Sequence, residues 1–193
     1  MQDEAGTPLT TDRPASSAAT PGTDRSASRP SSARSPLGAA LACALLVLVL
    51  DQGSKAWALT ALDERARPLL GDLVMLRLIR NPGAAFSLGA GSTLLMTLIA
   101  AAITVALVVV LRRTTNRSLA VGLGAVLGGA LGNLLDRLFR APGPGRGHVV
   151  DFLDYGGLFV GNLADIAIVL AGAYVAWRWQ AADETTATGD RHG

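Results

Sequence analysis

Cysteine and histidine, the residues that most often form disulfides and transition-metal sites, are almost missing from this chain. Cys43 is the single cysteine, and His148 and His192 are the only histidines among 193 residues. One cysteine cannot form an intramolecular disulfide, and two distant histidines do not supply the ligand cluster of a zinc site. We therefore expect no disulfide, no bound metal and no cofactor, with Cys43 packing as a small apolar residue.

Charged and aromatic side chains are also scarce. They make up 17% and 5% of the chain, whereas 50% is hydrophobic and the mean hydropathy is +0.37. Lys55 is the only lysine, and no run of basic residues suggests a nucleic-acid partner. This composition is too apolar for an ordinary soluble domain and indicates a small integral membrane protein.

The two ends of the chain differ from its middle. Residues 1–36 are rich in Ser, Thr, Ala and Pro and lack apolar periodicity, which predicts a disordered tail. The tail is not expected to be a secretory signal peptide, because no small-residue cleavage site follows the first apolar stretch before Asp51. Residues 180–193 form a second polar tail, which we expect to be flexible. The membrane domain is then residues 37–179.

Four stretches have the length and composition of membrane-spanning helices, which need about 20 mostly apolar residues. They run from Leu37 to about Leu59, from Ser92 to Leu111, from Leu119 to Leu135, and from about Leu158 to Trp179. The third contains Gly124, Gly128 and Gly132, and glycines four positions apart favour close helix packing. The predicted fold class is an all-α polytopic membrane protein with four transmembrane helices.

The arginines that flank the spans predict the orientation. Arg112, Arg113 and Arg117 lie in the short link between the second and third spans, and short arginine-rich loops usually stay in the cytoplasm. Both termini would then be cytoplasmic. The long connection after the first span also carries arginines (Arg65, Arg67, Arg77 and Arg80), but the rule is strongest for short loops.

The long connection between the first two spans is expected to form a small extracytoplasmic β cap. Residues 73–80 partly alternate apolar and charged side chains, as a strand at an interface does. Asn81-Pro82-Gly83 then predicts a turn, and Ala84-Ala85-Phe86-Ser87 leads towards the second span.

With this topology the unusual polar residues gather at the outer side of the membrane. They are Asp51, Lys55, Asn81, Asn133, Asp136, Arg137, Asp151, Asn162 and Asp165. Asp151 and Asp165 are the most informative, because a carboxylate at membrane depth costs at least ~2.5–3.5 kcal/mol and is functional by default. They lie fourteen positions apart around a short Gly-rich connection, so they could meet at one membrane surface as an acid–base pair.

Each of these residues also has a purely structural interpretation. Asp51 and Lys55 are spaced as an ordinary helical salt bridge, and Asp136-Arg137 could end a helix with the arginine directed to lipid phosphates. Asn81 could be only a turn residue, and Asn162 only an N-cap. Asp165 could compensate the positive end of a helix dipole.

Two other classes of protein, a transporter and an assembly protein, are alternatives to an enzyme. A proton-coupled transporter or channel would place charges through the whole bilayer depth, whereas the middle and inner halves of these spans lack them. An assembly protein with glycine-packed helices would need the two aspartates for folding rather than for turnover.

Five segments together resemble the lipoprotein signal peptidases, the type II signal peptidases of bacteria. They are Asp51-Gln52-Gly53-Ser54-Lys55, Asn81-Pro82-Gly83-Ala84-Ala85-Phe86-Ser87, the stretch from Gly128 to Arg137, Val149-Val150-Asp151-Phe152, and Asn162-Leu163-Ala164-Asp165. The resemblance runs from about Leu37 to Trp179. Two features depart from the family pattern: Gly161 stands where an aromatic residue is usual, and residues 140–148 are longer and richer in Pro and Gly.

The resemblance implies an aspartyl endopeptidase whose catalytic dyad is Asp151 and Asp165. Its substrate would be a prolipoprotein carrying a diacylglyceryl-cysteine, cut just before that cysteine. Two close carboxylates share a proton, so the ionised one can take a proton from water while the other polarises the scissile carbonyl. Either aspartate could carry the shared proton.

The remaining polar residues are expected to support this reaction. Asn81, Arg137 and Asn162 would bind substrate backbone or lipid-ester oxygens, since amide and guanidinium groups donate to them. Asp51, Lys55, Asn133 and Asp136 would brace the pocket. We expect a monomer in the bacterial cytoplasmic membrane, in contact with membrane lipids, with its active site on the extracytoplasmic side.

Overall fold

The computed structural model describes residues 35–83 and 92–189, with side chains described as far as residue 180. The predicted disordered tail falls outside this range except for Ser35 and Pro36, and so do Ala84 to Ser87 of the second motif. The elements are α1 (Pro36–Ala61), β1 (Arg67–Leu70), β2 (Val74–Asn81), α2 (Thr93–Arg113), α3 (Arg117–Phe139), β3 (Val149–Asp154), β4 (Val160–Gly161) and α4 (Leu163–Gly189).

Local signals in the sequence set the starts of two helices. Pro36 occupies the first turn of α1, and the Ser35 hydroxyl accepts a hydrogen bond from the Gly38 backbone N–H at 3.0 Å. Asn116 caps α3 in the same way, accepting from the backbone N–H of Ser118 and of Leu119. A side-chain acceptor at this position satisfies N–H groups that have no partner within the helix.

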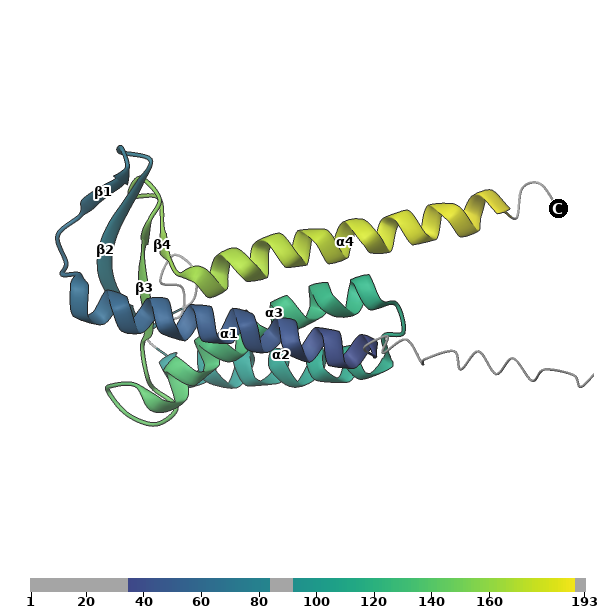
Figure 1. The fold of residues 1–193 in the computed structure, drawn as a ribbon. Helices are drawn as coiled ribbons and strands as arrows, with labels where there is room; N and C mark the ends of the chain where they lie inside the picture. Colours follow the sequence, from purple (N-terminus) through teal and green to yellow (C-terminus); the bar gives the residue numbers. More distant parts are fainter. Residues whose placement is uncertain (1–34, 84–91, 190–193) are drawn as a thin grey trace, which may run out of the picture. The chain divides into compact units, whose positions relative to one another are not determined.

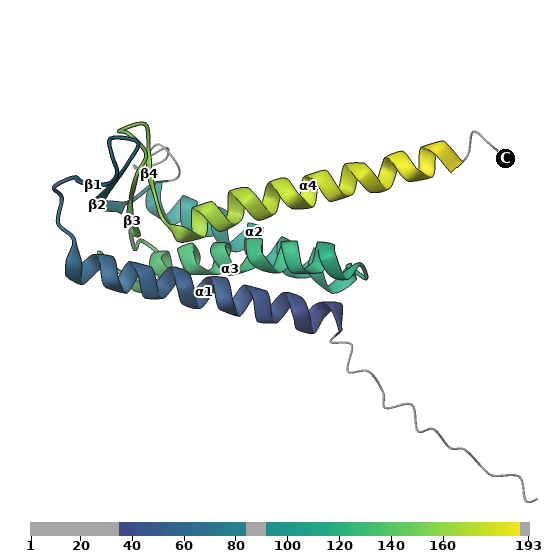
Figure 2. The same ribbon diagram turned by 45° about the horizontal axis from the view of Figure 1, so that its top comes forward.

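Helix α3 is the central helix and packs against α1, α2 and α4 (Figures 1 and 2). A Cβ at Gly124 or Gly128 would overlap the α1 backbone at Ala40 or Ala44. The close packing predicted from the glycines of this span is therefore confirmed, and it is the absence of side chains on α3 that permits it.

Three of the helices, α1, α2 and α3, are long and apolar enough to cross a membrane. The fourth predicted span corresponds to α4, whose role as a transmembrane helix stays a prediction. Its bounds differ from the expected ones, since α4 begins at Leu163 rather than Leu158 and remains helical to Gly189. Between Gly172 and Gly189 no Gly or Pro interrupts the helix, so the backbone is helical where we expected a flexible tail.

The predicted β cap is present, but it is larger than the connection that suggested it. Strands β1, β2, β3 and β4 form one antiparallel sheet in that order, at one end of the helices (Figure 1). In the β2–β3 pair, Ile79 lies opposite Asp151 and Asn81 opposite Val149. The predicted helical fold with a small β cap is thus confirmed in outline, and the cap is a four-stranded sheet built from two distant parts of the chain.

Candidate active site

The polar residues singled out in the sequence lie together where the sheet meets the helices. Asp51 and Lys55 come from α1, Asn81 from β2, Asn133, Asp136 and Arg137 from α3, Asp151 from β3, and Asn162 and Asp165 from the start of α4. Six are buried, and Asn81, Asn133 and Asp165 are half-buried. Each element contributes only one to three of them, so the fold assembles the site.

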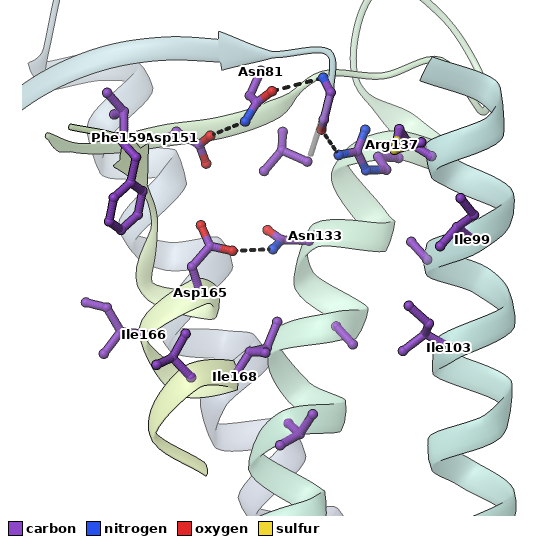
Figure 3. A pocket seen from close by; sticks show the side chains of 18 of the residues that line it. Asn81, Ile99, Ile103, Asn133, Arg137, Asp151, Phe159, Asp165, Ile166 and Ile168 are labelled. Carbon is purple, nitrogen blue, oxygen red and sulfur yellow. Dashed lines mark hydrogen bonds between the residues drawn. The ribbon is translucent and has the colours of Figure 1, made fainter. Parts of the chain in front are cut away.

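Asp151 is held in the sheet with its carboxylate directed towards the helices. One carboxylate oxygen accepts from the Asn162 amide at 2.7 Å. The other accepts from the Asn81 amide at 2.9 Å, the bond drawn in Figure 3. The side chain is only 2% exposed. Burial raises the pKa of Asp151 to about 7, because burial penalises the charged carboxylate, and the two amide donors oppose this rise.

Asp165 lies in the first turn of α4 and faces the same space. Its Oδ1 accepts from the Asn133 amide at 2.9 Å (Figure 3), and its Oδ2 accepts from the Asn162 backbone N–H at 3.1 Å. The side-chain oxygen of Asn162, Oδ1, in turn accepts from the Asp165 backbone N–H, which completes a reciprocal capping arrangement. Asn162 is therefore an N-cap as one interpretation held, and it also binds Asp151.

Lys55 is at the centre of a second cluster of buried charges, which contacts Asn133 next to the two aspartates. Its ammonium contacts Asp51 Oδ2 and Asp136 Oδ2 at 2.9 Å each and donates to Asn133 Oδ1 at 2.8 Å. Asp51 and Lys55 are both 0% exposed. The interpretation of this pair as an ordinary exposed salt bridge is wrong, because both charges are withdrawn from water.

Gln52 and Arg140 belong to this buried cluster, although no role was assigned to them from the sequence. Gln52 donates to Asp51 and Asp136, and Arg140 donates to Asp136. Gln52 follows Asp51 in the first motif, which was the one available signal for it. Arg140 lies four positions after Asp136 on the last turn of the helix, a spacing that brings side chains together.

Asp136 and Arg137 turn inward rather than towards lipid headgroups. Asp136 accepts from the Val150 backbone N–H at 3.1 Å and so ties α3 to β3. Arg137 is 7% exposed and donates to the backbone carbonyl of Gly83.

The turn predicted at Asn81 is confirmed, since the Gly83 backbone N–H donates to the Asn81 side-chain oxygen at 2.9 Å.

A cavity of about 720 Å³ opens beside the two aspartates. At one end it is lined by Asn81, Asn133, Arg137, Asp151 and Asp165. Its walls are apolar side chains of α2, α3 and α4, among them Ile99, Ile103, Val126, Ile166 and Ile168 (Figure 3). The cavity therefore combines a polar end with an apolar groove between helices.

Two aromatic residues of the β3–β4 turn also line the cavity, and the sequence had given no signal for them. The rings of Tyr155 and Phe159 stack with centroids 4.6 Å apart. A Cβ at Gly161 would lie 3.2 Å from the Phe159 ring and 2.9 Å from Asp165 Oδ2. Phe159 thus places an aromatic ring beside the position where this chain has Gly161 instead of the usual aromatic residue.

Comparison with known proteins identifies the family. A sequence model of signal peptidase II matches residues 43–180, which include every residue of the site. The chain belongs to the signal peptidase II family. The resemblance predicted from the five motifs is therefore confirmed. Among the described residues, no group of three or more His, Cys, Asp or Glu side chains could hold a metal ion.

Individual relatives agree with this assignment. A lipoprotein signal peptidase of Mycobacterium avium is 49% identical over 130 residues, which cover 67% of this chain and 71% of that protein. One of Rhodococcus jostii is 44% identical over 126 residues, covering 64% of this chain and 63% of the relative, so the chain spans less than two thirds of its length. A solved structure described as a bacterial membrane enzyme superposes with a TM-score of 0.66 at 25% identity, covering 78% and 92% of the two chains.

Proposed function

We propose that this protein is an intramembrane aspartyl endopeptidase that removes the signal peptide from diacylglyceryl-modified prolipoproteins by cutting before the lipidated cysteine. One observation carries the proposal: Asp151 and Asp165, from different elements, line the polar end of one cavity whose remaining walls are apolar. Membership of the signal peptidase II family and the names of the relatives support the substrate class.

The two carboxylates can divide the work of peptide hydrolysis. With the pKa of Asp151 raised to about 7 by burial, the pair holds one proton at neutral pH. The protonated member polarises the scissile carbonyl while the ionised member takes a proton from the attacking water. The proton taken from water is then given to the leaving amine, which restores the starting state.

The shape of the cavity suits a lipid-modified peptide. Its apolar walls on α2 and α4 would receive the acyl chains, and its polar end would receive the peptide bond. Asn81, Arg137 and Asn162 were expected to bind substrate, yet their amide and guanidinium groups donate to Asp151 and to the Gly83 carbonyl. Substrate contacts by these residues would add to these internal bonds, and their role in binding stays a proposal.

The placement in the membrane is part of the proposal. Helices α1 to α4 would all span the bilayer with both termini in the cytoplasm, which puts the sheet and the dyad on the extracytoplasmic side. Arg112 and Arg113 end α2 at the opposite end from the sheet (Figure 1) and support this orientation. We expect the protein to act as a monomer.

Cleavage of a diacylglyceryl-modified prolipoprotein by detergent-purified protein tests the proposal. Asp151→Asn and Asp165→Asn should each fold and lower turnover by about 10²–10⁴-fold, the usual contribution of a general acid or base. Asp154→Asn is the matched control. Asp154 is also 2% exposed and on β3, but it pairs with Arg77 at 3.0 Å and does not line the cavity.

Three results would each overturn part or all of the proposal. A well-folded wild type that leaves the lipidated substrate intact would remove the proposed activity. Wild-type turnover by Asp151→Asn would keep the peptidase activity and remove the dyad mechanism. If Asp154→Asn loses as much turnover as Asp151→Asn and Asp165→Asn, then replacing any buried aspartate lowers activity, and the loss cannot be assigned to the chemistry of the dyad.

A further inference from the structure

The buried ammonium of Lys55 is linked to Asp165 through a single amide, that of Asn133. Lys55 Nζ donates to Asn133 Oδ1 at 2.8 Å, and Asn133 Nδ2 donates to Asp165 Oδ1 at 2.9 Å. We propose that Lys55 is a positioning residue that fixes the orientation of Asn133 and thereby holds Asp165 as the ionised member of the dyad. This inference rests on the proposed function, since it assigns the two roles within that dyad.

Hydrogen-bond counting leaves Asn133 only one orientation. An ammonium has three donors, and those of Lys55 are used by Asp51, Asp136 and Asn133. Asn133 Oδ1 also accepts from the Asn162 amide at 3.1 Å. Turning the Asn133 amide by 180° would set its N–H₂ group against two donors and its oxygen against the Asp165 carboxylate. The orientation that donates to Asp165 is the one that Lys55 imposes.

The other contacts of Lys55 do not by themselves account for a buried ammonium. Asp136 already accepts from Arg140, from Gln52 and from the Val150 backbone N–H, and Asp51 accepts from the Ala164 backbone N–H at 3.1 Å. A buried ion pair is weak evidence for stability, because desolvation of the charges offsets their attraction. The third contact, to Asn133, is the one that reaches the dyad.

The charged groups that act on Asp165 come from several elements. They are Asp51 and Lys55 of α1, Arg137 of α3, Asp151 of β3, and the titratable Tyr155 of the β3–β4 turn. Asp136 of α3 pairs with Lys55. The side chains with which α2 lines the cavity are apolar in the described part of the chain.

Asp151 differs from Asp165 in this environment. Its carboxylate accepts from the side chains of Asn81 and Asn162, whereas the side-chain donor to Asp165 is Asn133, the amide that accepts from the Lys55 ammonium. Asp151 is then the member that holds the proton and polarises the scissile carbonyl. Asp165 is the member that takes the proton from water.

The test is the pH dependence of turnover in Asp51→Asn with Lys55→Gln, compared with Asp51→Asn alone. The double variant removes one cation and one anion from the buried cluster and leaves Asp136 paired with Arg140, so the cluster stays charge-balanced. Without the ammonium, the acid limb of the kcat profile should move up by about 1 pH unit, a tenfold loss of kcat on that limb. KM should stay unchanged, because Lys55 does not line the cavity.

The single variant moves the same limb in the other direction. Asp51→Asn keeps the ammonium and removes an anion, so the acid limb should stay in place or move down. A purely structural role for Lys55 predicts loss of thermal stability in the double variant without this opposite pair of shifts. A double variant whose acid limb coincides with that of Asp51→Asn overturns the inference.

A second variant decides the matter if the double variant does not fold. Asn133→Ala leaves the contacts of Lys55 with Asp51 and Asp136 in place and removes the link to Asp165, together with the contact from the Asn162 amide. The acid limb should again move up by about 1 pH unit, and an unchanged limb overturns the inference. Failure of the wild type to cleave the substrate at any pH would instead reject the proposed function, so the two failures are distinguishable.

Discussion

Each carboxylate of the dyad accepts two hydrogen bonds, and asparagine residues supply all four. Asp151 accepts from the side chains of Asn81 and Asn162, and Asp165 accepts from the Asn133 side chain and the Asn162 backbone. Amides orient a carboxylate without adding a full charge, so they do not force both members to ionise as a contacting arginine would. The pair can therefore keep one proton.

Asn81 gives a direct test of how these amides set the protonation state. Donation from Asn81 lowers the pKa of Asp151 against the larger effect of burial. Asn81→Ala removes that donor, so the pKa should rise further. With Asp151 as the proposed protonated member, activity is lost as pH rises through this pKa, and the alkaline limb of kcat should move up by about 1 pH unit.

The measurement is the kcat–pH profile of Asn81→Ala beside wild type and Asp154→Asn. Asp154 lies on the same strand but is paired with Arg77, so its variant should keep the wild-type alkaline limb. A limb that moves down in Asn81→Ala, or that stays in place, contradicts the role assigned to this amide.

At the scale of residues, the sequence predicted the members of the site but not their bonds. The cost of intramembrane charge identified Asp151 and Asp165 as candidates, and the predicted topology placed the other polar groups on the same side of the membrane. Contacts such as Asn133 to Asp165, or Val150 to Asp136, depend on the packing of segments distant in sequence. Tyr155 and Phe159 carried no signal, because their stacking arises only from the turn between β3 and β4.

At the scale of elements, α3 tolerates few substitutions on the face that packs against α1, because its small residues allow the two backbones to come close together. A Cβ at Gly124 would overlap the Ala40 backbone carbonyl, which cannot rotate away as a flexible side chain could. Gly124→Ala should therefore lower the free energy of unfolding by about 1–3 kcal/mol, the usual cost of overpacking. The thermal midpoint in detergent measures this.

Gly172 in α4 is the matched control for that substitution. A Cβ there would meet no atom within 4 Å, so Gly172→Ala should be neutral or should stabilise by up to ~1 kcal/mol through helix propensity. If both alanine variants shift the midpoint equally, helix propensity rather than packing is being measured, and the argument from Gly124 fails.

Periodicity and length were sufficient for the helices but not for the second half of the sheet. Residues 73–80 alternate and predicted β2, whereas Val149-Val150-Asp151-Phe152 is a short apolar run that periodicity cannot assign to strand or helix. Pairing with β2 decides it, and that pairing is non-local. The start of α4 was placed too early because Leu158, Phe159 and Val160 are apolar, although they belong to a turn and to β4.

In the membrane domain as a whole, the sheet and the helices divide the requirements of the site. Helices α1, α3 and α4 supply the buried charge, and α2, α3 and α4 supply the apolar groove. Strands β2 and β3 bring Asn81 and Asp151 to its polar end (Figure 3). Under the proposed function, the dyad at this junction would meet water while a lipid-anchored substrate keeps its acyl chains in the bilayer. That function requires the sheet to face the side to which prolipoproteins are exported.

The orientation can be measured with single cysteines in a Cys43→Ala background. Asp72 is exposed at the tip between β1 and β2, and Thr115 is exposed in the link between α2 and α3, at opposite ends of the helices. A membrane-impermeant maleimide added to intact bacteria should label Asp72→Cys and should label Thr115→Cys only after permeabilisation. The reason is that a short link carrying Arg112, Arg113 and Arg117 is expected to stay in the cytoplasm.

Both cysteine variants must still cleave the lipidated substrate, so that the labelled molecules are the active ones. Labelling of Thr115→Cys in intact cells, with Asp72→Cys protected, would place the dyad on the cytoplasmic side. A signal peptide whose cleavage site has already been exported could not reach it there, so that result would contradict the proposed substrate as well as the topology. Labelling at the sheet alone places the two aspartates on the side where the lipidated cysteine of an exported prolipoprotein lies.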